Sequence, residues 1–100
     1  MNQLQLVAVI AERDALRYTP AGIPIVSATL SHRSEQIEAG IKRQIELEVA
    51  AIAAGEISGR VNRAELGVAY RFTGFLARKN RNSKGLVFHI ADFEVYTPDQ

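Results

Sequence analysis

Residues 41–51 decide the fold of this 100-residue chain, and they read Ile-Lys-Arg-Gln-Ile-Glu-Leu-Glu-Val-Ala-Ala. Apolar side chains stand at nearly every second position, with Lys42, Glu46 and Glu48 between them. Because successive side chains of a β-strand point to opposite faces, this alternation predicts a strand with a core face and a solvated face. A helix is the alternative, since Glu, Ala, Leu and Ile all tolerate one, but the apolar residues form no stripe at i, i+3 and i+4.

Four further segments show the same period of two. We expect strands over residues 4–11, 25–32, 68–77 and 86–96, the first continuing with a bend through residues 12–14. Gly74, inside the fourth of the five strands, predicts a bulge or a tight bend. In the last strand the apolar positions change parity between Ile90 and Phe93, which predicts a bulge near residues 91–92.

The segments between these strands are rich in turn residues. Pro20 and Gly22 predict a turn, and Pro24 cannot donate a hydrogen bond to a sheet. We interpret the other segments as a polar connection (34–40), an irregular connection with a helical turn near its end (52–66, turn 61–66), a hairpin tip (78–85) and a short tail (97–100). Gly55 and Gly59 are interpreted as loop residues of the irregular connection.

Five strands in a chain of this length suit one small domain, residues 1–100. The longest connection lies between the third and fourth strands, where the OB-fold barrel accepts an insert of variable length. We therefore predict an all-β protein with a single five-stranded OB-fold β-barrel. A β-sandwich is the alternative, although five strands would make a thin one.

The composition narrows the possible chemistry. The chain has no Cys, which excludes a disulfide framework, a thiolate zinc site and a thiol nucleophile. The two histidines, His32 and His89, lie far apart in two predicted strands, and we interpret them as half-exposed strand residues rather than metal ligands. Neither a phosphate-binding glycine loop nor a nucleophile motif is present. We expect no enzymatic activity, no cofactor and no metal site.

The chain also lacks the usual targeting signals. No apolar run approaches the ~20 residues of a membrane-spanning helix. Residues 1–5 contain no basic region followed by an apolar block, so we expect no signal peptide and a cytoplasmic location.

The net charge is only +1, but acidic and basic residues are distributed unevenly along the chain. Acidic residues gather between residues 35 and 65, whereas residues 66–91 contain neither Asp nor Glu. Within that acid-free stretch the predicted hairpin tip carries four cations, Arg78, Lys79, Arg81 and Lys84. Lys and Arg displace counterions from phosphates, and the loop between the last two strands flanks the binding face of an OB-fold. The pattern predicts nucleic-acid binding, with a merely solvated hairpin tip as the alternative.

Exposed aromatic side chains are the second feature that would indicate nucleic-acid binding, because single-strand binders stack bases on them. The chain has no Trp, three Tyr and four Phe. Phe75 shares the more polar face of its strand with Arg71 and Thr73, which makes it the first candidate for a stacking platform. Tyr18, which stands shortly before Pro20, is the second.

Three short segments carry a resemblance to a known family. They are Pro20-Ala21-Gly22-Ile23-Pro24, His32-Arg33-Ser34-Glu35-Gln36 and Glu38-Ala39-Gly40-Ile41-Lys42-Arg43-Gln44. With Gly74-Phe75-Leu76 before the basic hairpin tip, they make the chain resemble the primosomal replication protein N (PriB) family over nearly its whole length. The nearest relatives of that family are single-stranded DNA-binding proteins.

The resemblance implies a non-enzymatic homodimer of OB-folds that binds single-stranded DNA in replication restart. It further implies that such a protein stabilises the PriA helicase on DNA and promotes primosome assembly with the loader protein DnaT. Carried over residue by residue, the basic DNA-contacting positions of the family match Arg13, Arg17, Arg33, Lys79, Arg81 and Lys84. Phe75 matches an aromatic position. Together with Arg78 from the charge pattern, these residues are the candidate DNA site.

The chain departs from the family at two positions of the third strand. Well-studied members carry aromatic residues there, including a Trp, whereas this chain has Ile41 and Glu46. A carboxylate repels phosphate, so we expect weaker and more salt-sensitive DNA binding that depends on the basic hairpin tip. The alternative function is an OB-fold dimer that acts mainly as a protein-interaction module for a helicase. An RNA-binding OB-fold is disfavoured because the expected surface aromatic cluster is missing.

Overall fold

The chain folds mainly into β-strands, and the computed structural model describes residues 1–98. In chain order the elements are β1 (Leu4–Arg13), β2 (Arg17–Tyr18), β3 (Pro24–Glu38), β4 (Ile41–Ala54), α1 (Glu56–Arg63), β5 (Ala69–Arg78) and β6 (Leu86–Val95). Of the predicted tail, residues 99 and 100 lie outside the described residues.

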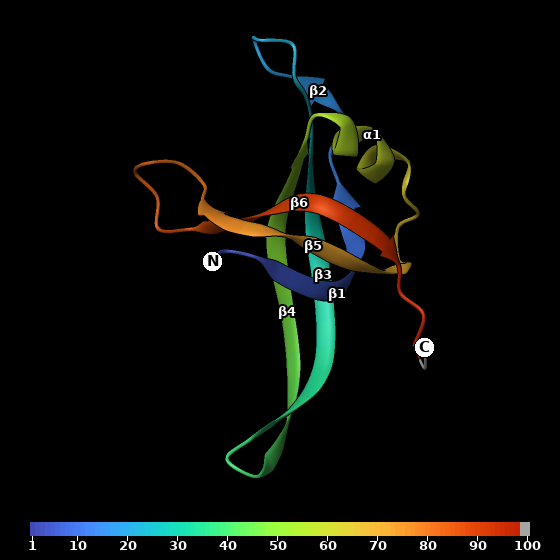
Figure 1. The fold of residues 1–100 in the computed structure, drawn as a ribbon, viewed down its shortest axis with the longest axis vertical. Coiled ribbons are helices and arrows are strands. Elements are labelled where there is room, and N and C mark those ends of the chain that lie inside the picture. Colours follow the sequence, from blue (N-terminus) through green and yellow to red (C-terminus); the bar gives the residue numbers. More distant parts are fainter. Residues whose placement is uncertain (99–100) are drawn as a thin grey trace.

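Five of the strands close into a barrel (Figure 1). β1 pairs with β5, β5 with β6, β6 with β4 and β4 with β3, which returns to β1. The pairs are antiparallel except β4 with β6, which is parallel. The two-residue β2 pairs with the start of β3. This is the predicted OB-fold layout, and the sandwich alternative is wrong.

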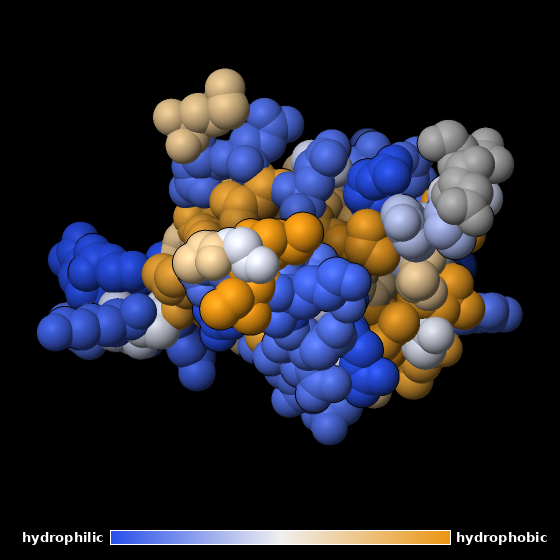
Figure 2. Space-filling view, turned by 90° about the horizontal axis from the view of Figure 1, so that it is seen from below, coloured by the Kyte–Doolittle hydropathy of each residue, from blue (hydrophilic) through white to orange (hydrophobic). Residues whose placement is uncertain are grey.

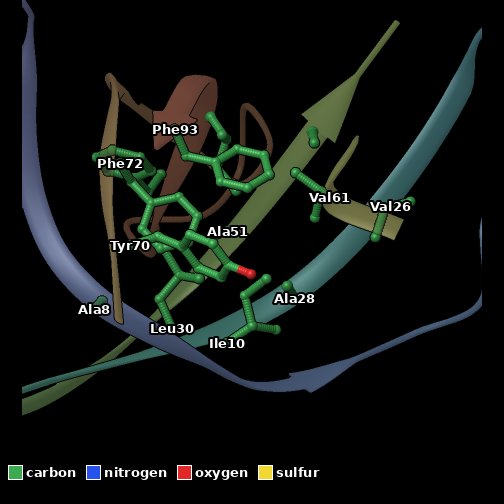
Figure 3. Close-up of a cluster of buried hydrophobic side chains, with 13 residues drawn as sticks. Ala8, Ile10, Val26, Ala28, Leu30, Ala51, Val61, Tyr70, Phe72 and Phe93 are labelled. Atoms are coloured by element: carbon green, nitrogen blue, oxygen red, sulfur yellow. The ribbon is translucent and has the colours of Figure 1, made fainter. Parts of the chain in front are cut away.

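The barrel interior is filled by the inward faces of the strands (Figure 3). Ile10 and Leu30 are fully buried there, beside an aromatic group of Tyr70, Phe72 and Phe93. The ring centroids of Tyr70 and Phe93 lie 5.1 Å apart edge to face, and those of Phe72 and Phe93 lie 5.5 Å apart. Burying one such large apolar side chain stabilises the fold by about 1.5–3 kcal/mol. This core anchors the strands that carry the surface described below.

Strands β3 and β4 are longer than the sequence pattern predicts. Residues 34–38 were expected to be a polar connection, but they continue β3 and pair with residues 41–45 of β4. Only Ala39 and Gly40 form the turn, with φ of 54° and 75°, as a tight two-residue hairpin requires. The polar composition misled the prediction because a two-stranded ribbon exposed on both faces also needs polar residues. Residues 33–46 form a projecting β3–β4 arm (Figure 1).

Because of the arm, the alternating residues 41–51 belong to the barrel core only in their second half. Ala51 and Ala53 are buried in the core, but Ile41 and Leu47 are 65% and 41% exposed. The predicted period is right, whereas the predicted core face is wrong for the first half of β4, because that half extends beyond the barrel. Seen from below, hydrophobic side chains are visible at the tip of the arm (Figure 2), where Ile37 is also exposed.

A helix occupies the segment that was predicted to be irregular. α1 spans Glu56–Arg63, so the predicted helical turn near residues 61–66 is displaced and Gly59 lies inside the helix rather than in a loop. Gly55 precedes the helix at φ 82°, which glycine adopts without strain, and the buried Ser58 hydroxyl donates to its carbonyl at 2.6 Å. Val61 is buried in the core. No helix within residues 1–98 is long and apolar enough to cross a membrane.

The predicted irregularities of β5 and β6 are one and the same bulge. Thr73 pairs with Asp92 and Gly74 pairs with Ile90, which leaves Ala91 of β6 without a partner in this ladder. A Cβ at Gly74 would lie 1.9 Å from the backbone oxygen of His89. Glycine therefore permits a close approach of the two strands that no other residue allows.

Candidate nucleic-acid interface

A groove of about 520 Å³ crosses the outer face of the barrel. One of its walls runs from the end of β1 to the start of β2 and includes Arg13, Asp14 and Arg17. The other wall is the base of the loop between β5 and β6, with Arg78, Lys79 and Gly85. The groove floor consists of residues from β3, β4 and β6. In OB-folds the binding face lies between these two loops, so the groove occupies the expected place.

A row of cross-strand partners runs along the floor of the groove and continues past it to β5. Ser27 of β3 lies opposite Ile52 of β4, and Ile52 lies opposite His89 of β6. His89 in turn lies opposite Phe75 of β5. Partners across adjacent strands point to the same face of a sheet, so these four side chains follow one another across the barrel. Three of the four offer apolar or aromatic surface, which suits the faces of unpaired bases.

Two predicted arginines, Arg13 at the end of β1 and Arg17 in β2, stand at the first wall and differ in their contacts. The Arg17 guanidinium donates to the hydroxyl of Ser27 at 3.1 Å, which holds the exposed cation over the end of the row. Arg13 Nη1 instead donates to the carbonyls of Val61 and Ala64, at 2.9 and 2.6 Å. Carbonyls in the last turn of a helix lack the regular i+4 partner and can accept from a side chain, so Arg13 fastens α1 to β1. The sequence did not indicate this structural role.

The wall also carries negative charge. Glu12 and Asp14 line the groove together with the two arginines. This end of the groove is therefore close to neutral, and the excess of positive charge lies at the opposite end.

That opposite end is the basic loop, residues 78–85. Arg78 and Lys79 line the groove, while Arg81 and Lys84 are exposed further along the loop. The Lys79 backbone N–H donates to the carbonyl of Gly85 at 2.9 Å and closes the base of the loop. Within residues 1–98 none of the four cations has a carboxylate within ion-pair distance. The loop projects sideways from the barrel (Figure 1) and its surface is hydrophilic (Figure 2).

Arg33 lies away from the groove, on the β3–β4 arm. Its Nε is 3.1 Å from a carboxylate oxygen of Glu46 in the facing strand. Both side chains are largely exposed, and such pairs contribute only about 0–1 kcal/mol. The structure thus joins a predicted DNA-contacting cation to the carboxylate that was expected to repel phosphate, and the two charges offset each other.

Phe75 is 43% exposed on β5, and its ring is nearly parallel to the imidazole of His89. The two ring centroids are 4.8 Å apart and the planes differ by 11°. Tyr18, the second aromatic candidate, is exposed on β2 and does not line the groove. Of the two predicted aromatics, only Phe75 belongs to this row, at the end that lies beyond the groove.

Sequence reasoning did not select His89 or Ile52 as site residues. Their parity was readable, because His89 alternates with the core residues Phe88 and Ile90 and therefore points outward. Their meeting was not readable, because it depends on the parallel pairing of β4 with β6 across the barrel closure.

The barrel and its groove place the chain among the OB-fold proteins. Residues 2–92 match the model of a family described as "Another single-strand binding protein family". Replication restart protein PriB of Nitrosomonas europaea is 44% identical over 94 residues, which cover 94% of this chain and 87% of that protein. The structure of PriB from Ralstonia solanacearum, 43% identical, matches with a TM-score of 0.88 and covers 97% of this chain and 99% of that one.

The chain belongs to this single-strand binding protein family, and the resemblance to PriB is confirmed. The single-stranded DNA-binding protein of Thermus aquaticus shares the fold at a TM-score of 0.75 with 18% identity, covering 99% of this chain and 52% of that one. At that identity the likeness concerns the fold alone.

Proposed function

We propose that this protein binds single-stranded DNA in the groove and serves DNA replication restart as a non-enzymatic accessory. The observation that carries the proposal is the basic loop, whose four cations lack carboxylate partners in the described chain and border a largely apolar floor. Phosphates pair with such cations because counterions are released, and unpaired bases cover apolar and aromatic surface. The name of the relatives, replication restart protein PriB, supports the role in restart.

The restart role includes partners and a location. The protein stabilises the PriA helicase on DNA and promotes primosome assembly with DnaT, in the cytoplasm. Family membership supports these partners. Exchange of exposed residues on the arm and on the loop, followed by a helicase-binding assay, will map the surface that contacts them.

The protein acts as a homodimer, and the open side of β1 supports this part of the proposal. β1 pairs with β5 from Leu4 to Val9, but on its other side it pairs with β3 only from Val9 onward. Leu4 and Leu47 are 38% and 41% exposed, although both belong to faces that continue the barrel interior. A second β1 would cover the unpaired edge. Sedimentation at micromolar concentration should show twice the 11.0-kDa chain mass, and a species of single chain mass would contradict the dimer.

Binding is tested by titrating labelled thymidine oligomers and a duplex of equal length at low salt. We expect tighter binding of the single strand, because only unpaired bases can reach the groove floor. Equal affinity for both would indicate that phosphate attraction alone operates, and an absence of binding even at low salt would refute the proposal.

The alternative is a protein-interaction module for the helicase with incidental DNA contact. The neutralised Arg33–Glu46 pair and the exposed Ile37 and Ile41 on the arm favour it. The double variant Lys79→Glu/Arg81→Glu separates the two functions. Loss of DNA binding with helicase contact retained assigns the loop to DNA alone, whereas loss of both shows that the loop serves both partners.

A further inference from the structure

The stacked pair of His89 and Phe75 is the least explained feature of the groove. Resting on the proposed function, we propose that His89 is the residue on which an unpaired base stacks, and that Phe75 is the ring that supports it from behind. Phe75 was expected to be the platform, and the geometry assigns that contact to its neighbour.

The order of the side chains across the barrel carries this assignment. His89 lies between Ile52 and Phe75 in the row of cross-strand partners, and it lines the groove, whereas Phe75 does not. With the two rings nearly parallel at 4.8 Å, His89 covers the face of Phe75 that points toward the groove. A base that enters the groove therefore meets the imidazole first. Phe75 fixes the imidazole plane by stacking against its other face.

The contacts of the two histidines differ in a way that supports a ligand-binding role for His89. His32 has partners for both ring nitrogens, the Val7 carbonyl at 2.6 Å and the Ser34 hydroxyl at 2.8 Å. Among the hydrogen bonds of residues 1–98, none involves the ring of His89. His32 is held in place by the fold, while His89 keeps its polar atoms and its groove-facing ring surface for a ligand.

The surroundings of His89 define the class of that ligand. Arg17 stands at one end of the groove and Arg78 with Lys79 at the other, so phosphates can bind on both sides of the central ring. A flat ring on an apolar floor between cations suits a nucleobase of a single strand. Because every base has a π-face, this contact adds affinity with little sequence preference.

The test compares His89→Ala and His89→Phe with the wild type, using fluorescence anisotropy of labelled thymidine oligomers over a salt series. Stacking is worth about 1–3 kcal/mol per base, so His89→Ala should weaken binding about five-fold or more. The slope of log Kd against log salt should stay unchanged, since no phosphate contact is removed. His89→Phe, which keeps a ring, should restore the affinity.

Val95→Ala is the matched control, because Val95 is 63% exposed on the same strand and does not line the groove. In the wild type the ring protons of His89 should shift upfield in NMR spectra when the oligomer is added, a readout that needs no variant. Wild-type affinity for His89→Ala and unshifted ring protons, with binding still lost in Lys79→Glu, would overturn the role of His89 and leave DNA binding intact. If the wild type itself does not bind the oligomer, the proposed function fails.

Discussion

Replacing Lys79, Arg81 and Lys84 together by Gln should remove most of the salt dependence of DNA binding. These three cations are exposed on the basic loop, and no carboxylate of the described chain neutralises them. Each cation that neutralises a phosphate of a single strand contributes about 0.7 to the slope of log affinity against log salt. The triple variant should therefore lower the slope by about 2, and three such contacts change affinity about twenty-fold between roughly 50 and 200 mM salt.

The assay is anisotropy of a labelled thymidine oligomer at five or more salt concentrations. A control variant loses the same number of cations elsewhere: Lys42, Arg43 and Arg71 change to Gln. Each of these pairs with a glutamate, Lys42 with Glu35 at 3.9 Å and Arg71 with Glu94 at 3.1 Å. The control thus has the same net charge as the loop variant, and its slope should remain near that of the wild type.

Two results would refute the reasoning. An unchanged slope in the loop variant would show that the loop does not contact phosphate. A drop of equal size in both variants would show that the overall charge matters and that the position of the loop does not.

Three further predictions concern single residues. Gly74→Ala should destabilise the fold by about 1–3 kcal/mol or more in urea unfolding, because its Cβ would meet the His89 carbonyl oxygen at 1.9 Å; wild-type stability would contradict the close approach. Glu46→Gln should strengthen DNA binding several-fold, because it releases Arg33 from the 3.1 Å pair, and an unchanged affinity would exclude Arg33 from the DNA path. Arg60 donates to Asp92 at 2.7 Å and, with the backbone N–H of Phe93, holds the pKa of Asp92 below its usual 3.8. The ionised Asp92 therefore stabilises the fold above pH 3.8, and this stabilisation is lost as the pH falls through the lowered pKa. Asp92→Asn should reduce the free energy of unfolding at pH 7 and reduce it less near pH 3. An equal reduction at both pH values would be inconsistent with the pairing.

Local pattern accounts for much of the fold. The five barrel strands, the bulge of β5 against β6 and the acid-free basic hairpin were all predicted from residue periodicity and composition. These features are readable because each depends on neighbours in the chain: a period of two, a glycine inside a strand or a run of cations. The errors arose where solvent exposure does not follow polarity. The arm was taken for a loop because its residues are polar, and the eight-residue α1 was too short to show a helical period.

The candidate site also contains features that the sequence predicted and features that only the structure decided. The sequence alone located the loop cations and the outward parity of Phe75, and by resemblance it gave the family. The DNA-binding positions that the resemblance implies stay a prediction. Tertiary structure decided that Arg13 fastens α1, that Arg33 is neutralised by Glu46 and that His89 stands between Phe75 and the groove. The Arg13 contact joins elements that are distant in the chain. The other two join neighbouring strands of a hairpin, where the register determines which side chains meet. The charge or aromatic character of a side chain can be read from the sequence. Which partner it contacts is determined by the register between strands and by the packing of the elements.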